Sequence, residues 1–181
     1  VLYMKTINEN LTVEVIKEMG EEIDLWRIIE PMWWTVNIYG TYEEYLKSAK
    51  DFTAEQRYLL ALQWYAAETD NGGHHQLFFN STGIVWKDAL EAFKLFGIDN
   101  LYNNLLEVIE FFGGDVSFDR KQRWDMLSKA EEKDEEALYD FLDKHDRFFY
   151  ENEDFGDKLI DYIKNNPEKF VFVGSYETDE D

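Results

Sequence analysis

Helix breakers are scarce in this chain: its 181 residues contain only two prolines, Pro31 and Pro167. Proline removes a backbone hydrogen bond and clashes with the preceding turn, so its scarcity favours long helices. Apolar residues recur three and four positions apart, which is typical of helices with one buried face. The sequence therefore predicts an all-α fold, a compact single-domain bundle of about eight helices. A short extended segment is expected over residues 169–173, with no second strand to form a sheet.

Capping residues and glycines indicate several helix boundaries. Thr53 and Gln56 form a capping box, and the helix that follows is apolar on nearly every side, as a central helix would be. The run 71–73, Asn-Gly-Gly, is expected to end it. Pro31 either kinks one helix within residues 22–39 or starts a second one. The later helices are expected from about Val85 to Gly97, from a capping Asp99 to Gly113, from Ser117 or Asp119 to Ala130, and over residues 133–150 and 155–165.

The expected organisation is one domain with additions at its ends. Residues 1–51 are expected to form a helical part packed on the main body, residues 52–170 the main helical domain, and residues 171–181 an acidic tail. The first few residues and the tail from Tyr176 are expected to be flexible. The start of the chain lacks the apolar core of a signal peptide, and no apolar run approaches transmembrane length. A cytoplasmic location is therefore expected.

Charge is the property in which the chain departs furthest from an ordinary domain. Eighteen Lys and Arg stand against 39 Asp and Glu, a net charge of −21; a magnitude of roughly 2–8 is usual for a small domain. Residues 131–181 hold 18 of the acidic and 6 of the basic residues, so more than half of the excess lies there. Such a surface repels nucleic acid and anionic membranes and attracts basic partners. The alternative is an acidic surface kept only for solubility.

The acidic residues of this last third fall on helix faces. At 100° per residue, a helix over residues 131–150 separates an apolar arc from an acidic one. The acidic arc, opposite Ala137, Leu138, Phe141, Leu142, Phe148 and Phe149, consists of Glu132, Glu136, Asp140 and Asp143. The next helix repeats the pattern with Asp154, Asp157 and Asp161. Like charges three and four residues apart cost a few tenths of a kcal/mol per pair, and their density is comparable to that of DNA phosphates. These seven acids are the predicted partner-binding residues.

Catalytic and metal-binding motifs are scarce. The absence of cysteine excludes disulfides, thiolate metal sites and a cysteine nucleophile, and no serine nucleophile elbow or phosphate-binding loop occurs. The strongest metal pattern, similar to that of HD phosphohydrolases, consists of His145 and Asp146 with His74 or His75 and with Asp157 or Asp161. His145, however, falls on the apolar side of its helix, which favours a hydrogen-bonded core histidine. We therefore predict that the protein is not an enzyme and that it binds neither a cofactor nor a metal. The alternative from another functional class is a metal-dependent phosphohydrolase.

One run of thirteen residues carries a family resemblance. Residues 71–83 read Asn-Gly-Gly-His-His-Gln-Leu-Phe-Phe-Asn-Ser-Thr-Gly. This run resembles the signature of a bacterial family of DNA-mimic proteins, first catalogued as a domain of unknown function. Trp64-Tyr65 upstream, the helix from about Val85, and the late runs 148–151 and 167–170 fit the same family. The similarity extends over roughly residues 52–170.

The resemblance implies a compact helical domain whose acidic surface imitates duplex DNA and occupies the DNA-binding groove of a basic protein. Mimicry depends on surface charge, so the motif itself is expected to be architectural. Its glycines are expected to permit a turn with at least one positive φ, and its asparagines to form hydrogen bonds with the loop backbone. Its glutamine is expected to form a hydrogen bond within the core, and its phenylalanines to pack. The motif residues are Asn71, Gly72, Gly73, Gln76, Phe78, Phe79, Asn80, Ser81 and Gly83.

The expected partner is a basic DNA-binding protein, such as a transcription factor or a nucleoid protein, which the chain inhibits or regulates. An immunity-type protein that neutralises a basic nuclease toxin would use the same electrostatics and remains an alternative. Direct nucleic-acid binding is not expected, because the net charge opposes it.

Overall fold

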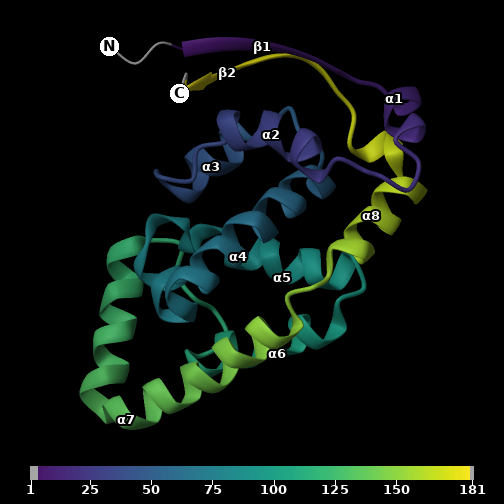
Figure 1. The fold of residues 1–181 in the computed structure, drawn as a ribbon. Coiled ribbons are helices and arrows are strands. Elements are labelled where there is room, and N and C mark those ends of the chain that lie inside the picture. The colour runs from purple at the N-terminus through teal and green to yellow at the C-terminus, as the bar shows by residue number, and fades with distance from the viewer. Residues whose placement is uncertain (1–3, 180–181) are drawn as a thin grey trace.

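The computed structural model describes residues 4–179 and is helical through most of that range (Figure 1). The predicted all-α class is confirmed, with eight α-helices among the described residues. The helices are α1 Val13–Glu18, α2 Leu25–Thr35, α3 Tyr42–Ser48, α4 Ala54–Phe79, α5 Trp86–Leu95, α6 Asp99–Phe111, α7 Arg120–Asn152 and α8 Gly156–Asn165. Two short 3₁₀ helices, η1 Ser81–Val85 and η2 Pro167–Lys169, and two strands, β1 Met4–Leu11 and β2 Phe172–Asp179, complete the chain.

The central element is α4, which contacts α2, α5 and α7 (Figure 1). The predicted capping box is present: the Gln56 N–H donates to Thr53 Oγ1 at 3.1 Å, and the Thr53 N–H donates to Gln56 Oε1 at 2.8 Å. In the turns that follow, leucines and Tyr65 are buried on several sides of the helix. Stacking of Trp33 from α2 on Trp64, with ring centroids 4.0 Å apart, joins the N-terminal helices to this element.

The Asn-Gly-Gly run bends α4 but does not end it. Gly72 and Gly73 have non-helical backbone angles, yet the helix resumes and continues to Phe79. The predicted helix end is therefore a kink, and the helix terminus lies six residues further along. Pro31 does not start a new helix either: it lies inside α2, which continues through it as one helix.

Two predicted helix starts have different outcomes. Asp119 caps α7, where its carboxylate accepts a hydrogen bond from the Gln122 N–H at 2.9 Å. Asp99, predicted as a cap, is instead the first residue of α6, and the cap position belongs to Ile98 without a side-chain hydrogen bond. A carboxylate in the first helical turn still interacts favourably with the helix dipole.

The two described ends of the chain pair with each other. β1 and β2 form an antiparallel sheet, in register from Met4 opposite Asp179 to Leu11 opposite Phe172. An extended segment was expected over residues 169–173, whereas β2 starts at Phe172 and continues to Asp179. The expectation that the segment has no partner was wrong, as was the expectation of a flexible tail from Tyr176. Tyr176 is 5% exposed within β2. Residues 1–3, which were also expected to be flexible, lie outside the described residues, as do residues 180 and 181.

Buried apolar side chains from Leu11 to Phe170 form one continuous core. The N-terminal helices, α4 to α6 and the inner sides of α7 and α8 all contribute to it. None of the helices in residues 4–179 has the length and apolar character needed to cross a membrane.

Candidate functional site

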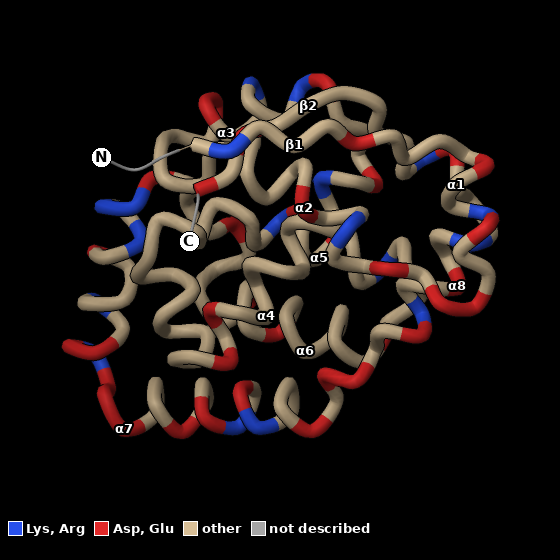
Figure 2. The backbone as a smooth tube through the Cα atoms, turned by 45° about the horizontal axis from the view of Figure 1, so that its top comes forward, with Lys and Arg blue, Asp and Glu red and all other residues tan. Residues whose placement is uncertain are grey.

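An acidic row lies on the second segment of α7. Glu136, Asp140 and Asp143 are exposed, whereas Leu138 and Leu142 on the opposite side are buried. Figure 2 shows acidic positions along this segment, at the edge of the molecule. The three residues are three or four positions apart, so their carboxylates project from one face. They span about 10 Å at 1.5 Å per residue, over which one DNA strand presents about three phosphates.

Glu132 does not belong to this row. The wheel over residues 131–150 treated the helix as continuous, but α7 breaks at Asp134, where φ is −167° and ψ is 91°. The Asp134 carboxylate accepts a hydrogen bond from the Ala137 N–H at 3.0 Å and so caps the second segment. The helix axis changes direction there (Figure 1), which leaves Glu132 exposed on the first segment. Ala137 and Phe148, assigned to the apolar arc, are exposed.

The three remaining predicted acids lie around α8. Asp157 and Asp161 are exposed on this helix, opposite the buried Leu159 and Ile163, and Asp154 is exposed in the connection before it. Within residues 4–179, none of the seven predicted acids forms an ion pair. Their negative charge is therefore not neutralised by contact with the described cations and can act on a basic partner.

The acidic segment also carries cations. Lys144 and Arg147 are exposed on the second segment of α7. The Arg147 Nε–H donates to the backbone carbonyl of Asp143 at 3.4 Å and not to its carboxylate. On α8, Lys164 pairs with Glu21 from another part of the chain. The row is thus a local excess of negative charge rather than a uniformly negative surface.

The carboxylate of Glu68 organises the family motif. It accepts hydrogen bonds from the side chains of Gln76 at 2.7 Å, Asn80 at 2.9 Å and Thr82 at 2.5 Å. Gln76 and Asn80 were expected to bond to the core and to loop backbone, respectively, but both bond to this one acid. Sequence reasoning missed Glu68, because any of the 39 acids was an equally good candidate.

Arg123 holds the other side of the motif. The side chain is 0% exposed and donates only to backbone carbonyls, which are those of Phe78, Asn80, Ser81, Ser117 and Phe118. A side chain on Gly83 would collide with this guanidinium, which explains the glycine. Burial, with a smaller contribution from Arg120, lowers the pKa of Arg123 to about 10, so it stays cationic at neutral pH. Sequence reasoning missed Arg123, although it precedes Leu127 by four residues on the inward side of α7.

The remaining motif residues divide between core and surface. Both phenylalanines were expected to pack: Phe78 is buried at 0% exposure, and Phe79 is 46% exposed and stacks on Trp124. Asn71, expected to tie loop backbone, is exposed, and among the described residues its side chain makes no hydrogen bond. Ser81 is half-buried at the start of η1.

The kink of α4 is attached to α7 through Asp146. Gly73 has φ +68°, as predicted for one of the two glycines, and a side chain there would collide with the Asp146 carboxylate. That carboxylate accepts hydrogen bonds from the His74 backbone N–H at 2.9 Å and from His74 Nδ1–H. The other ring nitrogen, Nε2, forms a hydrogen bond with the Tyr65 hydroxyl at 2.6 Å. In this chain of three side chains Tyr65 and His74 are buried and Asp146 is half-buried, and together they link the two helices.

His145 is 1% exposed, as its position on the apolar side of the helix predicted. Its ring nitrogens contact the backbone carbonyl of Phe141 at 2.8 Å and the carboxylate of Glu107 at 2.9 Å. His74 binds Asp146 within the core, and His145 faces Glu107, so the residues of the metal pattern are divided between two structural pairs. In residues 4–179, no three histidine or carboxylate side chains converge on one point as metal ligands would.

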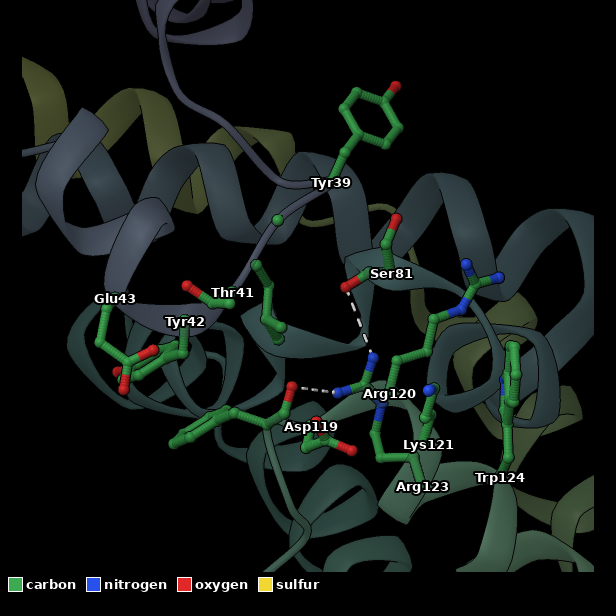
Figure 3. Close-up of a pocket in the computed structure, with 13 residues that line it drawn as sticks. Tyr39, Thr41, Tyr42, Glu43, Ser81, Asp119, Arg120, Lys121, Arg123 and Trp124 are labelled. Atoms are coloured by element: carbon green, nitrogen blue, oxygen red, sulfur yellow. Dashed lines mark hydrogen bonds between the residues drawn. The ribbon is translucent and has the colours of Figure 1, made fainter.

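A cavity of about 590 Å³ opens between the segment leading into α3 and the start of α7 (Figure 3). Its walls combine aromatic with polar and charged side chains, and on one side Tyr42 stacks on Phe118 with ring centroids 3.8 Å apart. Arg120 and Trp124 of α7 stand on the opposite side. Such a volume lies within the range of ligand pockets. Trp124, which lines the cavity, stacks on the exposed Phe79 at the end of α4.

The family signature and the exposed acidic row together point to one family. Residues 50–166 match the family model described as DMP19-like protein, the family of DNA-mimic proteins. The chain belongs to this family. No curated protein and no solved structure matched it.

The matched region of this DMP19-like chain covers more than half of it and contains the motif, Glu68, Arg123 and all seven predicted acids. Neither strand lies within the matched residues. The terminal sheet therefore lies outside the matched region.

Proposed function

We propose that this DMP19-like protein is a DNA mimic that binds a basic DNA-binding protein, a transcription factor or a nucleoid protein, and inhibits or regulates it. The observation that carries the proposal is the row of Glu136, Asp140 and Asp143. These three exposed carboxylates form no ion pair with any residue of the described part of the chain, and their spacing is close to that of phosphates. Family membership supports mimicry in general, and the row supplies a surface that could perform it. The further contacts we assign are Glu132, Asp154, Asp157 and Asp161.

Binding of this kind excludes DNA by competition. A DNA-binding groove places Lys and Arg where phosphates lie, and the carboxylate row would occupy those cations in their place. A chain of net charge −21 is repelled by DNA. The proposal therefore includes no direct nucleic-acid contact, no catalysis and no cofactor, and it places the protein in the cytoplasm with its partner. In this proposal residues 1–51 form a part that packs on the domain of residues 52–170.

The test is a salt titration with a charge-neutral, shape-preserving variant. The immobilised chain captures proteins from a bacterial lysate at low salt, and the DNA-binding protein recovered is purified and titrated. Glu136→Gln, Asp140→Asn and Asp143→Asn together should weaken its affinity at low salt by about tenfold or more. The slope of log affinity against log salt should become shallower, because fewer charge contacts form.

The matched control removes three exposed acids elsewhere, by Glu18→Gln, Asp51→Asn and Asp115→Asn. It has the same net charge, so it should bind nearly as well as the parent chain. Duplex DNA should compete with the parent for the partner. A partner that binds DNA and this chain simultaneously, or equal affinities for both triple variants, would contradict the proposal. Recovery of a nuclease instead would favour the immunity-type alternative.

A further inference from the structure

A row of stacked rings crosses the surface between the end of α4 and α7. In order, Tyr139, His75, Phe79 and Trp124 stack with successive centroid separations of 6.0, 6.2 and 5.3 Å. The guanidinium of Arg120 ends the row, 4.9 Å from the ring centre of Trp124. We call these five residues the aromatic ladder. Sequence reasoning missed it because two of its members belong to the motif and three to α7.

The ladder is exposed to solvent. Phe79, Trp124 and Tyr139 are 46%, 37% and 39% exposed. Three large aromatic side chains in adjacent exposed positions are unusual on a surface with no binding role, and Trp, Tyr and Arg are the residues most often responsible for affinity at protein interfaces.

The ladder is also held rigid. Arg120 Nε–H and Trp124 Nε1–H both donate to the backbone carbonyl of Phe79, at 2.9 and 2.7 Å. The Tyr139 hydroxyl donates to Glu131 at 2.8 Å. That hydrogen bond raises the pKa of Tyr139, followed in effect by burial and by the charges of Glu131 and Glu135. Rings fixed in this way lose little conformational entropy when a partner binds.

Strong negative charge adjoins one end of the ladder. Residues 131–136 read Glu-Glu-Lys-Asp-Glu-Glu and surround the break of α7 at Asp134. We call this segment the acidic corner; Figure 2 shows acidic positions grouped at the bend. Glu131 connects corner and ladder, because it contacts both the Tyr139 hydroxyl and His75 Nε2. The opposite end of the ladder is positive, through Arg120 and the neighbouring Lys121.

We propose that the aromatic ladder and the acidic corner form one docking surface for a basic protein segment that carries a large apolar side chain. The inference rests on the proposed function, because the segment would belong to the same DNA-binding partner. Its Lys or Arg would face the acidic corner, and its apolar side chain would lie along Phe79 and Trp124, next to the cavity of Figure 3. A second copy of this chain is not the occupant we assign, since two chains of net charge −21 repel each other as wholes.

This surface gives the chain a contact that DNA cannot offer. Salt screens the carboxylate row as it screens phosphates, whereas apolar contact with the ladder is insensitive to it. The ladder would therefore keep the partner bound where charge alone no longer suffices.

Two synthetic peptides of equal positive charge test the inference with the full-length chain. One alternates lysines with leucines and the other alternates lysines with serines, and binding is followed by fluorescence anisotropy at about 0.05 M and about 0.5 M salt. Both should bind at low salt, and only the lysine–leucine peptide should remain bound at high salt. Trp124→Ala and Phe79→Ala should each weaken that remaining binding by about tenfold and leave the lysine–serine peptide unaffected.

The control variant is Trp26→Ala, which removes a tryptophan that is 45% exposed on α2, outside the ladder. It should bind both peptides as the parent does, and thermal melts confirm that each variant is folded. Equal loss of both peptides at high salt, or equal effects of Trp26→Ala and Trp124→Ala, would overturn the ladder while the electrostatic function stands. Failure of both peptides to bind at low salt would overturn the proposed function as well.

Discussion

Gly73 is the motif residue whose local geometry most strictly requires glycine. Its φ of +68° is disfavoured for any residue with a β-carbon, and a β-carbon there would also collide with the Asp146 carboxylate. Gly97, at the end of α5, has nearly the same φ of +72°, but nothing lies within 4 Å of the place a β-carbon would take. Comparing substitutions at these two glycines therefore separates the cost of backbone strain from the cost of steric collision.

Gly97→Ala should destabilise the protein by about 1–2 kcal/mol, the cost of the left-handed conformation. Gly73→Ala should cost more, because Asp146 must also move from His74, and Gly73→Val more again. Chemical denaturation followed by circular dichroism measures the free energies of unfolding. Equal losses for the two alanine variants would show that Asp146 moves aside freely. A Gly73 variant that unfolds like the parent yet loses its partner would make the motif a contact site.

Residues with a local signature were predictable, and residues defined by distant contacts were not. The positive φ within the Gly72-Gly73 pair followed from the turn, and the burial of His145 followed from helical spacing. Arg123 was missed because its acceptors are backbone carbonyls, which leave no trace in side-chain chemistry. The exposure of Phe79 was not predictable, because nothing in the sequence shows that the helix turns it towards Trp124.

At the scale of elements, the bend of α7 decides which acids form a row. The sequence predicted one helix ending near Ala130 and another from Lys133, which places the break correctly, but it did not identify Asp134 as the cap. Asp134 is the one aspartate among the five acids of residues 131–136, and aspartate is both a weaker helix former and a better N-cap than glutamate, so a signal for the break was present. The wheel did not use this signal and included Glu132, which lies beyond the bend.

Replacing Asp134 tests whether this cap defines the second segment. Asp134→Ala removes the acceptor for the Ala137 N–H and should cost about 1 kcal/mol, the usual value of an N-cap. Asp134→Asn keeps an acceptor while removing the charge, so it should be nearly neutral. Thermal unfolding of both variants gives the comparison. An asparagine variant as unstable as the alanine variant would show that charge at this position, and not capping, stabilises the bend.

The terminal sheet shows why long-range pairing escapes a local reading. An extended segment was expected over residues 169–173, which overlaps only the start of β2, and the partner of β2 lies at the opposite end of the chain. A single strand in isolation is not stable, and no local pattern connects the two segments. The ion pair of Glu9 with Arg27 on α2, at 2.7 Å, attaches β1 to the helices, and it too joins positions that local periodicity does not relate.

For the whole molecule, stability and partner binding make opposite demands on charge. A net charge of −21 repels itself in the folded state, and the row of Glu136, Asp140 and Asp143 adds two unfavourable neighbouring pairs. The same charges are what a basic partner recognises in the proposed function. Salt should therefore act on the two properties with opposite sign.

The last prediction follows from this opposition. Raising salt from 0.1 M to 1 M shortens the screening length from about 10 Å to about 3 Å, so the melting temperature of the parent chain should rise while its affinity for the partner falls. The variant Glu136→Gln, Asp140→Asn and Asp143→Asn should melt about 1–3 °C above the parent at low salt, because relief of each pair contributes a few tenths of a kcal/mol. The melting temperature of this variant should rise less with salt, since fewer repulsive pairs remain to be screened.

The control variant Glu18→Gln, Asp51→Asn and Asp115→Asn has the same net charge but no adjacent carboxylates within its set, so its melting temperature should exceed that of the parent by less. Differential scanning calorimetry at several salt concentrations gives all three melting curves. If the melting temperatures of both variants rise equally above that of the parent, repulsion is spread over the whole surface and the row is not a local concentration of charge. If neither gains, the carboxylates of the row do not interact, and a rigid phosphate-like array is the wrong description of that face.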